Sequence, residues 1–216
     1  PVEYRLPGIN QVQVNDKIEL TFARVLRSAL RQDPDVVLVG EMRDQETAQI
    51  GMRAAMTGHL VLSTLHTNDA ASTPIRLLDM GVPRYMVATS IQAVLAQRLV
   101  RRICESCHED HPLKPNEHQW LKAELKDAVD TAKFFHGRGC THCNGTGYHG
   151  RTGVYEMLEV TEAVADAANH PDPAHFLKAA HAQMAGETLR RHAVALAIAG
   201  KTTVSEAMRI SNQFED

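Results

Sequence analysis

The chain has 216 residues and a formal net charge of −3, and 44% of its residues are apolar. A chain of this length and composition can build a sizeable core, which excludes an intrinsically disordered protein. The acidic balance and the 5% of aromatic residues argue against a nucleic-acid partner, because nucleic-acid-binding proteins present basic faces and aromatic stacking platforms. No apolar window reaches about 18 residues and the chain opens without a signal-peptide pattern, so we expect no membrane-spanning helix and no signal peptide.

Two short apolar runs, residues 36–39 and 60–65, are the strongest strand signals in the chain. Polar residues close each run, as in buried parallel strands, and the helix-compatible segment between them, residues 45–57, stops at Gly58. The pattern therefore predicts a strand–helix–strand unit. In open α/β sheets the functional residues lie at the carboxyl ends of the strands. The polar residues at those two ends are Glu41, Arg43, Asp44, His66, Thr67 and Asp69.

Helices are expected on both sides of these strands. An amphipathic helix is predicted over residues 19–32, after an alternating segment at residues 11–15 that could form an edge strand. Its three arginines, Arg24, Arg27 and Arg31, form either a solvated face or a phosphate contact.

Capping signals place the ends of three further helices. Asp44 suits the N-cap of the helix over residues 45–57. Thr67 or Asn68 could cap a helix that ends at residue 80, since Gly81 follows at the position where a left-handed conformation is favoured. Pro83 is expected to open another helix, which would reach residue 97 with Val87, Ile91, Val94 and Leu95 on one face.

The second half of the chain contains a polar stretch and then a helical tail. A capping box of Thr203 and Glu206 predicts a last short helix, and Gly200 ends the helix before it. The expected elements are helices over residues 116–127, 162–168, 173–183 and 187–199 and a strand over residues 154–160.

Four cysteines form two C-x2-C pairs separated by 32 residues: Cys104, Cys107, Cys140 and Cys143. Each pair can place two thiolates on one turn, and two such turns make a tetrahedral site, for which zinc is the expected ion. The alternatives are two reduced pairs without metal and a redox role, which neither pair favours because neither opens a helix after a strand. Three nearby histidines could substitute as ligands: His108, His111 and His142.

Two histidines flank the second predicted strand. His66 lies at the carboxyl end, beside other polar residues, whereas His59 lies at the opposite end. We therefore expect a structural role for His59 and keep His66 as a candidate functional residue, although a structural role is also the commoner fate of a single histidine.

The central stretch LVGEMRDQETAQIGMRAAMTGHLVLSTLHTNDA resembles the core of the type II secretion and type IV pilus assembly ATPases, which belong to the secretion ATPase superfamily with a RecA-like fold. Within it, DPDVVLVGEMRD resembles the Walker B motif and TGHLVLSTLHTNDA the histidine box. PVEYRLPGINQVQVN resembles the end of the acidic "Asp box". QRLVRRICESC, the second cysteine pair and GYHGRTGVYEML resemble the tetracysteine region, and GETLRRHAVALAIAGKTTVSEAMRI resembles the C-terminal helical segment.

The resemblance implies roles for five residues. Glu41 would be the Walker B glutamate that polarises the attacking water or supports Mg²⁺, and His66 would contact or sense the γ-phosphate of ATP. Glu3 would be the last acidic residue of the Asp box, near the metal, and Arg43 and Asp44 would support the Walker B turn. The cofactors implied are ATP, Mg²⁺ and a structural Zn²⁺.

The fold implied is a partial RecA-like P-loop NTPase sheet, residues 1–97, with a tetracysteine zinc subdomain, residues 98–160, and a C-terminal helical subdomain, residues 161–216. The resemblance further implies a homo-hexameric motor on the cytoplasmic side of the bacterial inner membrane, in contact with the platform proteins of a secretion or pilus machine. The tetracysteine region favours the assembly and secretion branch over retraction ATPases, and the choice between pilus and secretion stays open.

One departure from the family is the phosphate loop. The sequence contains no G-x-x-x-x-G-K-[ST], and its single GKT, at residues 200–202, is expected to end a helix. In the family the loop precedes the Asp box, so it would lie upstream of Pro1, as would the arginine fingers. We therefore expect a piece of a longer ATPase that is inactive alone and hides its uncovered strands by dimerisation or local rearrangement.

Two questions stay open in the sequence. A zinc-stabilised interaction module without catalysis is the alternative function, because CTHCNGTG resembles one copy of a chaperone zinc repeat. Arg98, Arg101 and Arg102 either form a solvated or salt-bridged strand edge or contact a neighbouring subunit or the membrane platform.

Overall fold

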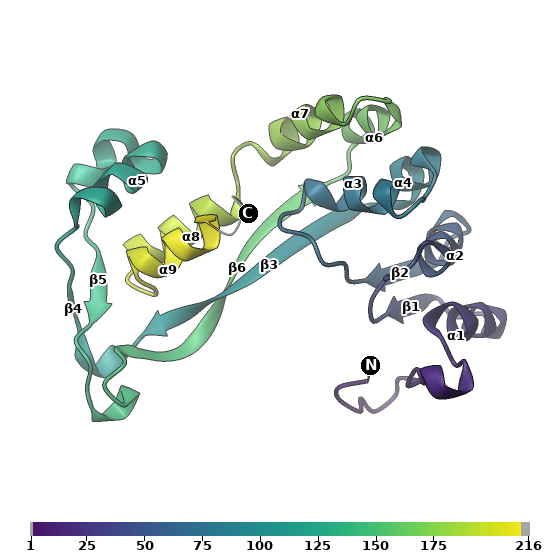
Figure 1. The fold of residues 1–216 in the computed structure, drawn as a ribbon, viewed down its shortest axis with the longest axis horizontal. Coiled ribbons are helices and arrows are strands. Elements are labelled where there is room, and N and C mark those ends of the chain that lie inside the picture. Colours follow the sequence, from purple (N-terminus) through teal and green to yellow (C-terminus); the bar gives the residue numbers. More distant parts are fainter. Residues whose placement is uncertain (1, 213–216) are drawn as a thin grey trace. The chain divides into compact units, whose positions relative to one another are not determined.

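The computed structural model describes residues 2–212, and its contacts divide the chain into two compact units (Figure 1). Unit 1 contains Pro1–Thr67, Ala71–Val94 and Glu159–Gln183. Unit 2 contains Asn68–Ala70, Leu95–Leu158 and Met184–Asp216. The helical tail is thus shared between the two units. The three subdomains expected at residues 1–97, 98–160 and 161–216 stay a prediction.

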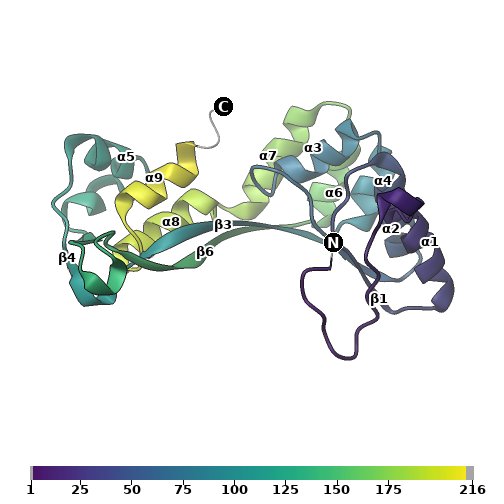
Figure 2. The same ribbon diagram turned by 60° about the horizontal axis from the view of Figure 1, so that its bottom comes forward.

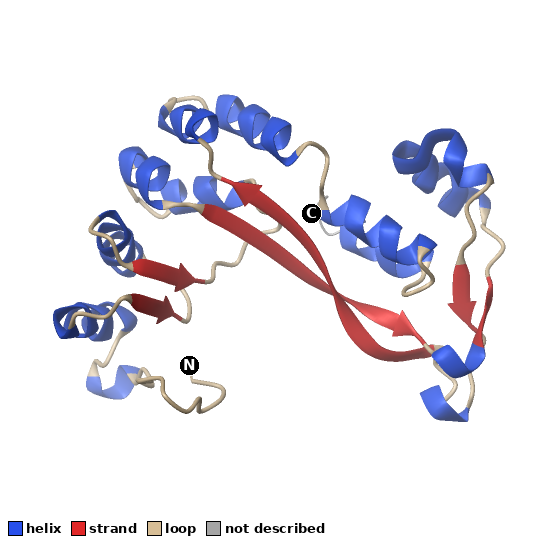
Figure 3. Ribbon diagram, turned by 180° about the vertical axis from the view of Figure 1, so that it is seen from behind, coloured by secondary structure: helices blue, strands red, loops and turns tan. Residues whose placement is uncertain are grey.

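Unit 1 is built on the expected strand–helix–strand unit. β1 (Val36–Val39) pairs in parallel with β2 (Leu60–Ser63), and α2 (Gln45–Met56) connects them (Figure 3). The register runs from Val36 opposite Leu60 to Val39 opposite Ser63. The prediction of this unit is confirmed, with the second strand ending two residues earlier than expected.

Unit 1 also contains the α-helices α1 (Phe22–Ala29), α3 (Ser72–Asp79), α4 (Arg84–Ser90), α6 (Glu162–Asn169) and most of α7 (Pro173–Met184), with short 3₁₀ turns at Asp16–Ile18 and Leu30–Gln32. The core consists of apolar side chains from α1, β1, α2, α3 and α4, among them Leu26, Val39, Met52, Leu77 and Val87.

The strands of unit 1 are covered on one face only, within the part of the chain that the structure describes. Val37, Val39 and Val61 pack toward the core. The alternate residues are exposed, namely Val36, Leu38, Leu60 and Leu62. The expectation of strands buried on both faces is therefore wrong for these residues. A strand is buried on both faces only when other elements pack on both faces of its sheet.

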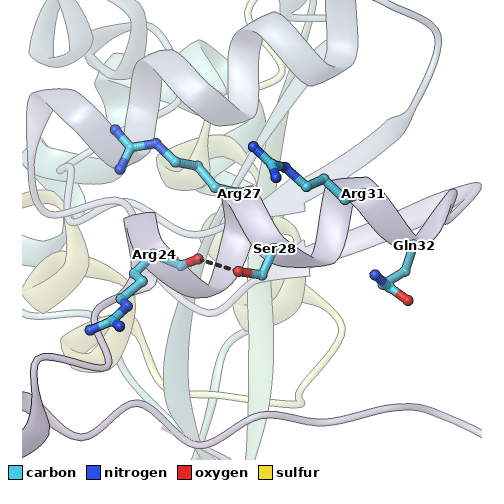
Figure 4. Close-up of a pocket in the computed structure, with 5 residues that line it drawn as sticks. All are labelled: Arg24, Arg27, Ser28, Arg31 and Gln32. Atoms are coloured by element: carbon cyan, nitrogen blue, oxygen red, sulfur yellow. Dashed lines mark hydrogen bonds between the residues drawn. The ribbon is translucent and has the colours of Figure 1, made fainter.

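The arginines of α1 and of the 3₁₀ turn that follows it, Leu30–Gln32, are exposed. Together with Ser28 and Gln32 they line a pocket on the helix surface (Figure 4): Arg24, Arg27 and Arg31. Arg27 forms an ion pair with Glu46 of α2. These positions agree with the interpretation of a solvated face.

Several expected boundaries in unit 1 are wrong. Residues 11–15 form no strand, apart from an isolated bridge between Asn15 and Leu20. α1 begins at Phe22, three residues later than the predicted start at residue 19. Thr21 is its N-cap, since the Thr21 side chain accepts a hydrogen bond from Arg24 N. α3 begins at Ser72, so neither Thr67 nor Asn68 is its N-cap. Gly81 has the expected left-handed conformation, with φ of 88°.

The largest error concerns residues 91–97. α4 ends at Ser90, and β3 (Ala93–Ile103) begins where the helix was expected to continue. Val94 and Leu95 fit both a helical and an alternating pattern, and the tertiary pairing with a distant strand decides between them.

Unit 2 contains most of β3 and of its partner strand β6 (Tyr148–Glu159), which lie side by side in both views (Figure 1, Figure 2). A short antiparallel pair, β4 (His108–Asp110) and β5 (Phe135–Gly137), precedes the second cysteine pair. The helices are α5 (Pro115–Leu125), α8 (Leu189–Ile198) and α9 (Val204–Asn212). Gly200 has φ of 67° directly after α8, which confirms that the GKT triplet ends a helix.

The core of unit 2 lies between its strands and helices. Val100 of β3 and Val154 of β6 are fully buried against Leu189 and Ala193 of α8 and Ala207 of α9. A second cluster joins α5 to the last two helices through Leu121, Val129, Phe134, Val194, Ala197 and Val204.

A buried carboxylate connects β3 to α9. Glu206 is 1% exposed and accepts hydrogen bonds from Arg101 N at 2.8 Å and from the Arg101 guanidinium at 2.9 Å. The Arg101 guanidinium also stacks on the Tyr148 ring, 4.0 Å from its centroid. Thr203 accepts from Glu206 N as the predicted capping box requires, while the Glu206 side chain is engaged by Arg101 and Arg209. Arg101 is therefore salt-bridged within the chain, and Arg102 likewise pairs with Glu105.

We expect Glu206→Gln to destabilise the 216-residue chain by about 1–3 kcal/mol at pH 7, because charge-assisted hydrogen bonds would be replaced by weaker ones. Although burial opposes ionisation, the hydrogen bonds from Arg101 and Arg209 lower the pKa of Glu206 below its ordinary 4.5. This contribution is present above pH 4.5 and is lost as the pH falls through the lowered pKa. Urea unfolding at pH 7 and below pH 4.5 should show the difference between the two proteins shrinking in acid. The exposed Glu159→Gln is the matched control, and an equal effect of both substitutions would contradict the expectation.

Candidate functional site

Three of the predicted site residues meet at the carboxyl ends of β1 and β2. The Glu41 carboxylate lies between two partners, with Oε1 3.0 Å from His66 Nε2 and Oε2 2.6 Å from Arg43 Nε. The Glu41 side chain is 13% exposed, whereas that of His66 is 91% exposed. The nearly buried Glu41 carboxylate is thus in contact with the solvent-exposed imidazole of His66.

Hydrogen bonds beyond the strands bring Glu41 and His66 together. Met42 N donates to Thr64 O at 3.1 Å, and the Thr64 hydroxyl donates to Gly40 O at 2.6 Å. These two contacts extend the parallel pairing past Val39 and Ser63, where the regular strands end. Thr64 was not singled out by sequence reasoning, although its place near the carboxyl end of the second apolar run, residues 60–65, is a signal that could have found it.

The chemistry available to this cluster follows from its charges. A carboxylate fixed by a guanidinium and an imidazole can accept hydrogen bonds from a water molecule or from the water shell of a cation. The exposed imidazole can donate to an anionic group such as a phosphate. Phosphoryl transfer needs groups of these kinds, placed around the reacting atoms and doing little covalent work.

Asp44 has a structural role at the start of α2. Its Oδ1 accepts from Thr47 N and its Oδ2 from the Thr47 hydroxyl, both at 2.8 Å, which confirms the predicted N-cap. Both carboxylate oxygens are therefore engaged by the helix that follows Glu41. The cap fixes where the turn after β1 becomes a helix.

Glu3 and His59 lie outside the Glu41 cluster. Glu3 is exposed in the N-terminal segment. The ring of His59 hydrogen-bonds through Nδ1 to Ala54 O at 3.0 Å, near the end of α2. This contact is the structural role expected for His59.

The four cysteine sulfurs converge in unit 2. All four lie within 4.8 Å of one another, and three of the sulfur pairs are 3.7–3.8 Å apart. In a tetrahedron of sulfurs about 2.3 Å from a central zinc ion, the edges are about 3.8 Å long. The sulfurs therefore have the spacing of a four-thiolate zinc site.

Backbone N–H groups point at two of these sulfurs. Gly139 N donates to Cys107 Sγ at 3.3 Å, and Cys140 N and Gly147 N donate to Cys143 Sγ at 3.2 Å. Burial raises the pKa of Cys143, but the N–H groups of Cys140 and Gly147 outweigh it and lower that pKa to about 6. Burial dominates at Cys107 and raises its pKa to about 12. The cluster thus already stabilises one thiolate, and a cation would stabilise the others.

Close backbone approach requires glycine at this site. A Cβ at Gly137 would overlap the carbonyl oxygen of Gly147, and a Cβ at Gly147 would overlap that of Gly137. The nearby histidines have other neighbours, since His108 stacks on Phe135 and His111 binds Glu117. Within residues 2–212, the cysteines form the single group of three or more metal-ligating side chains close enough to share an ion.

A family model described as "Type II/IV secretion system protein" matches residues 1–209. The chain belongs to this family. Relatives in the type II/IV secretion system protein family include the type II secretion system protein E of Dickeya dadantii, 46% identical over 99% of this chain, and that of Klebsiella pneumoniae, 48% identical over the same share. The type IV pilus assembly ATPase PilB of Thermus thermophilus is 45% identical over 96% of this chain.

The chain spans 42% of the length of the two type II secretion relatives and 23% of that of PilB. Among solved structures, the pilus retraction motor PilT with bound ADP has a TM-score of 0.60 and 29% identity, over 88% of this chain and 43% of PilT. The Legionella pneumophila ATPase DotB, 22% identical, has a TM-score of 0.66 over 99% of this chain and 50% of DotB, which shows similarity of fold. The α/β fold of this family member is thus that of secretion ATPases. Among the described residues, no helix has the length and apolarity needed to span a membrane.

The capping role of Asp44 can be separated from a role that needs its charge. Asp44→Ala should destabilise the chain by about 1 kcal/mol, because Thr47 N and the Thr47 hydroxyl would lose their acceptors, whereas Asp44→Asn should retain most of the cap. Chemical denaturation of both variants measures this difference. Equal destabilisation by Asn and Ala would show that the negative charge, and not the cap, is what the site requires.

Proposed function

We propose that this chain is the part of a motor ATPase that carries the Walker B glutamate, the sensing histidine and a structural zinc site, and that the whole protein drives assembly of a type II secretion pseudopilus or a type IV pilus. The observation that carries the proposal is the contact between Glu41 and His66 at the carboxyl ends of two parallel strands. Membership of the type II/IV secretion system protein family supports it.

The proposed roles follow from the geometry of the cluster. Bound Mg²⁺–ATP supplies the phosphoanhydride and the cation that neutralises its charge. Glu41, held by Arg43, accepts a hydrogen bond from the attacking water or from a magnesium-bound water. His66 is exposed on the other side of Glu41 and donates to the γ-phosphate, so its contact with Glu41 ties the glutamate to the presence of that phosphate. Glu3 would approach the cation from the Asp-box side.

The phosphates need further groups in this proposal, since the sequence contains no G-x-x-x-x-G-K-[ST]. We place the phosphate loop and the arginine fingers in parts of the protein outside this chain, which spans 42% of its type II secretion relatives. The 216-residue chain alone would therefore be inactive. The active form would be a RecA-like homo-hexamer at the cytoplasmic face of the inner membrane, bound to platform proteins.

The cysteine cluster supports a structural zinc ion at Cys104, Cys107, Cys140 and Cys143, because the sulfur spacing fits the ion. Four protein ligands leave no open position, so zinc would stabilise the surrounding loops and take no part in hydrolysis. The same observation supports a second candidate function, a zinc-stabilised interaction module without catalysis. The two functions differ in whether the whole protein hydrolyses ATP through Glu41.

Glu41→Gln in the full-length protein should lower the rate of Mg²⁺–ATP hydrolysis by roughly a hundredfold or more, because an amide cannot polarise the water as a carboxylate does. Steady-state phosphate release measures the rate, and nucleotide binding should persist. Glu162→Gln, in the exposed first turn of α6, is the control for the same substitution elsewhere. Unchanged hydrolysis by the Glu41 variant, or turnover by the 216-residue chain alone that Glu41→Gln removes, would contradict the proposed site.

Purified protein should contain about one zinc ion per chain, and Cys143→Ser should remove most of the metal and lower the melting temperature. Elemental analysis and thermal denaturation measure the two effects. His142→Asn is the matched control, because it alters a neighbouring residue of the same turn and leaves the four sulfurs in place. Zinc loss from the histidine variant, or full zinc content in the serine variant, would show that the ligand set is different.

A further inference from the structure

Another buried carboxylate of unit 2, Glu156, has no role in the proposed chemistry. Glu156 of β6 is 5% exposed and lies between Val154 and Leu158, both fully buried on the same face of the strand. A carboxylate in such surroundings persists only when hydrogen-bond donors compensate for the loss of water. The hydrogen-bond donors around Glu156 therefore indicate its structural role.

The two oxygens of Glu156 bind two segments that are far apart in sequence. Oε1 accepts from Ala70 N at 2.7 Å, and Oε2 accepts from Leu189 N at 2.8 Å. Ala70 is fully buried in a loop, and Leu189 is the first residue of α8. The N–H groups at a helix N-terminus have no partner within the helix, and the helix dipole also favours a negative charge there. Glu156 thus joins the loop around Ala70 to the start of α8.

The loop concerned follows the candidate active site directly. Residues 68–70 belong to unit 2 by their contacts, whereas the chain before Asn68 and after Ala70 belongs to unit 1. The Arg98 guanidinium of β3 donates to Asn68 O at 3.0 Å and holds the other end of the same loop. Since His66 lies two residues before Asn68, a change in the backbone at His66 reaches this loop through the chain itself.

We propose that Glu156 is a positioning residue that transmits the nucleotide state sensed at His66 to the N-terminus of α8. This inference rests on the proposed function. The two hydrogen bonds place Ala70 N and Leu189 N on one rigid carboxylate, so the loop and the helix move together. A displacement of residues 67–70 when a γ-phosphate binds His66 is then passed to α8, and with it to the helices and strands that pack on α8 in unit 2.

The conservative substitution Glu156→Gln separates linkage from packing. Glutamine has nearly the same shape, but it has one acceptor oxygen, and its NH₂ group would face the second N–H donor. One of the two links is therefore lost while the apolar surroundings are retained. Glu156→Ala would remove both links and leave two buried donors unpaired, with a risk of misfolding, so the glutamine variant carries the test.

The experiment is hydrogen exchange of the full-length protein, with and without a non-hydrolysable Mg²⁺–ATP analogue, for wild type, Glu156→Gln and the exposed control Glu159→Gln. In wild type and control, the analogue should slow exchange around His66, in residues 68–71 and in residues 187–190. In Glu156→Gln, the response around His66 should persist, and the response in residues 187–190 should fall to roughly a third or less. Steady-state hydrolysis should show a roughly tenfold lower kcat with KM within about twofold, because the analogue-binding groups are untouched.

Each result bears on the inference. A wild-type response at His66 without one in residues 187–190, or a Glu156→Gln protein whose exchange and kcat match those of the control, would overturn it and leave the proposed ATPase function intact. Loss of the response around His66 itself in Glu156→Gln would also overturn it, since the residue would then act in nucleotide binding. A wild-type protein with neither hydrolysis nor any response at His66 would overturn the proposed function, and this inference with it.

Discussion

The parallel pairing of β1 with β2 is the constraint on which the candidate active site depends. Glu41 and His66 come from different strands, and neither side chain could hold the other without the backbone contacts at the strand ends, Met42 N to Thr64 O and the Thr64 hydroxyl to Gly40 O. A one-residue slip in the register would turn Glu41 to the opposite face of the sheet. The N-cap at Asp44 fixes where α2 begins. The backbone at Glu41 is therefore held between the end of β1 and the start of α2.

A different constraint holds the region around the cysteines. Short strands such as β4 and β5, of three residues each, bury little apolar surface, and small substructures of this kind commonly rely on metal ions or disulfides. The glycines and N–H donors bring four sulfurs to tetrahedral spacing, where negative charge would accumulate if all four ionised. Backbone N–H groups lower the pKa of Cys143, whereas burial raises the pKa of Cys107. A divalent cation is the natural complement, and its binding energy would add directly to the stability of the fold.

The sequence predicted the parts of this structure that local patterns determine. The strand–helix–strand unit, the cap at Asp44, the approach of Glu41 to His66 and the convergence of the four cysteines all follow from short-range signals and one topological rule. It failed at residues 91–97, where apolar residues fit both a helix and a strand and the pairing with β6, more than 40 residues later, decides. It also missed Thr64, which lies within the second apolar run, and Glu156, whose partners are brought near only by the folded chain.

Glu156 and Glu206, two of the buried carboxylates of unit 2, show why such residues escape sequence reasoning. An apolar side chain at position 156 or 206 would pack as well and would avoid the desolvation of a charge. It could not, however, fix the position of a backbone N–H. Glu206 accepts from Arg101 N on β3, and Glu156 accepts from Ala70 N and Leu189 N, so each carboxylate sets the position of a segment that apolar packing alone would leave free to slide. The donors lie in β3, in the loop at Ala70 and at the first residue of α8. The charge at these two positions is therefore explained by the hydrogen bonds that join α8 to β6 and α9 to β3.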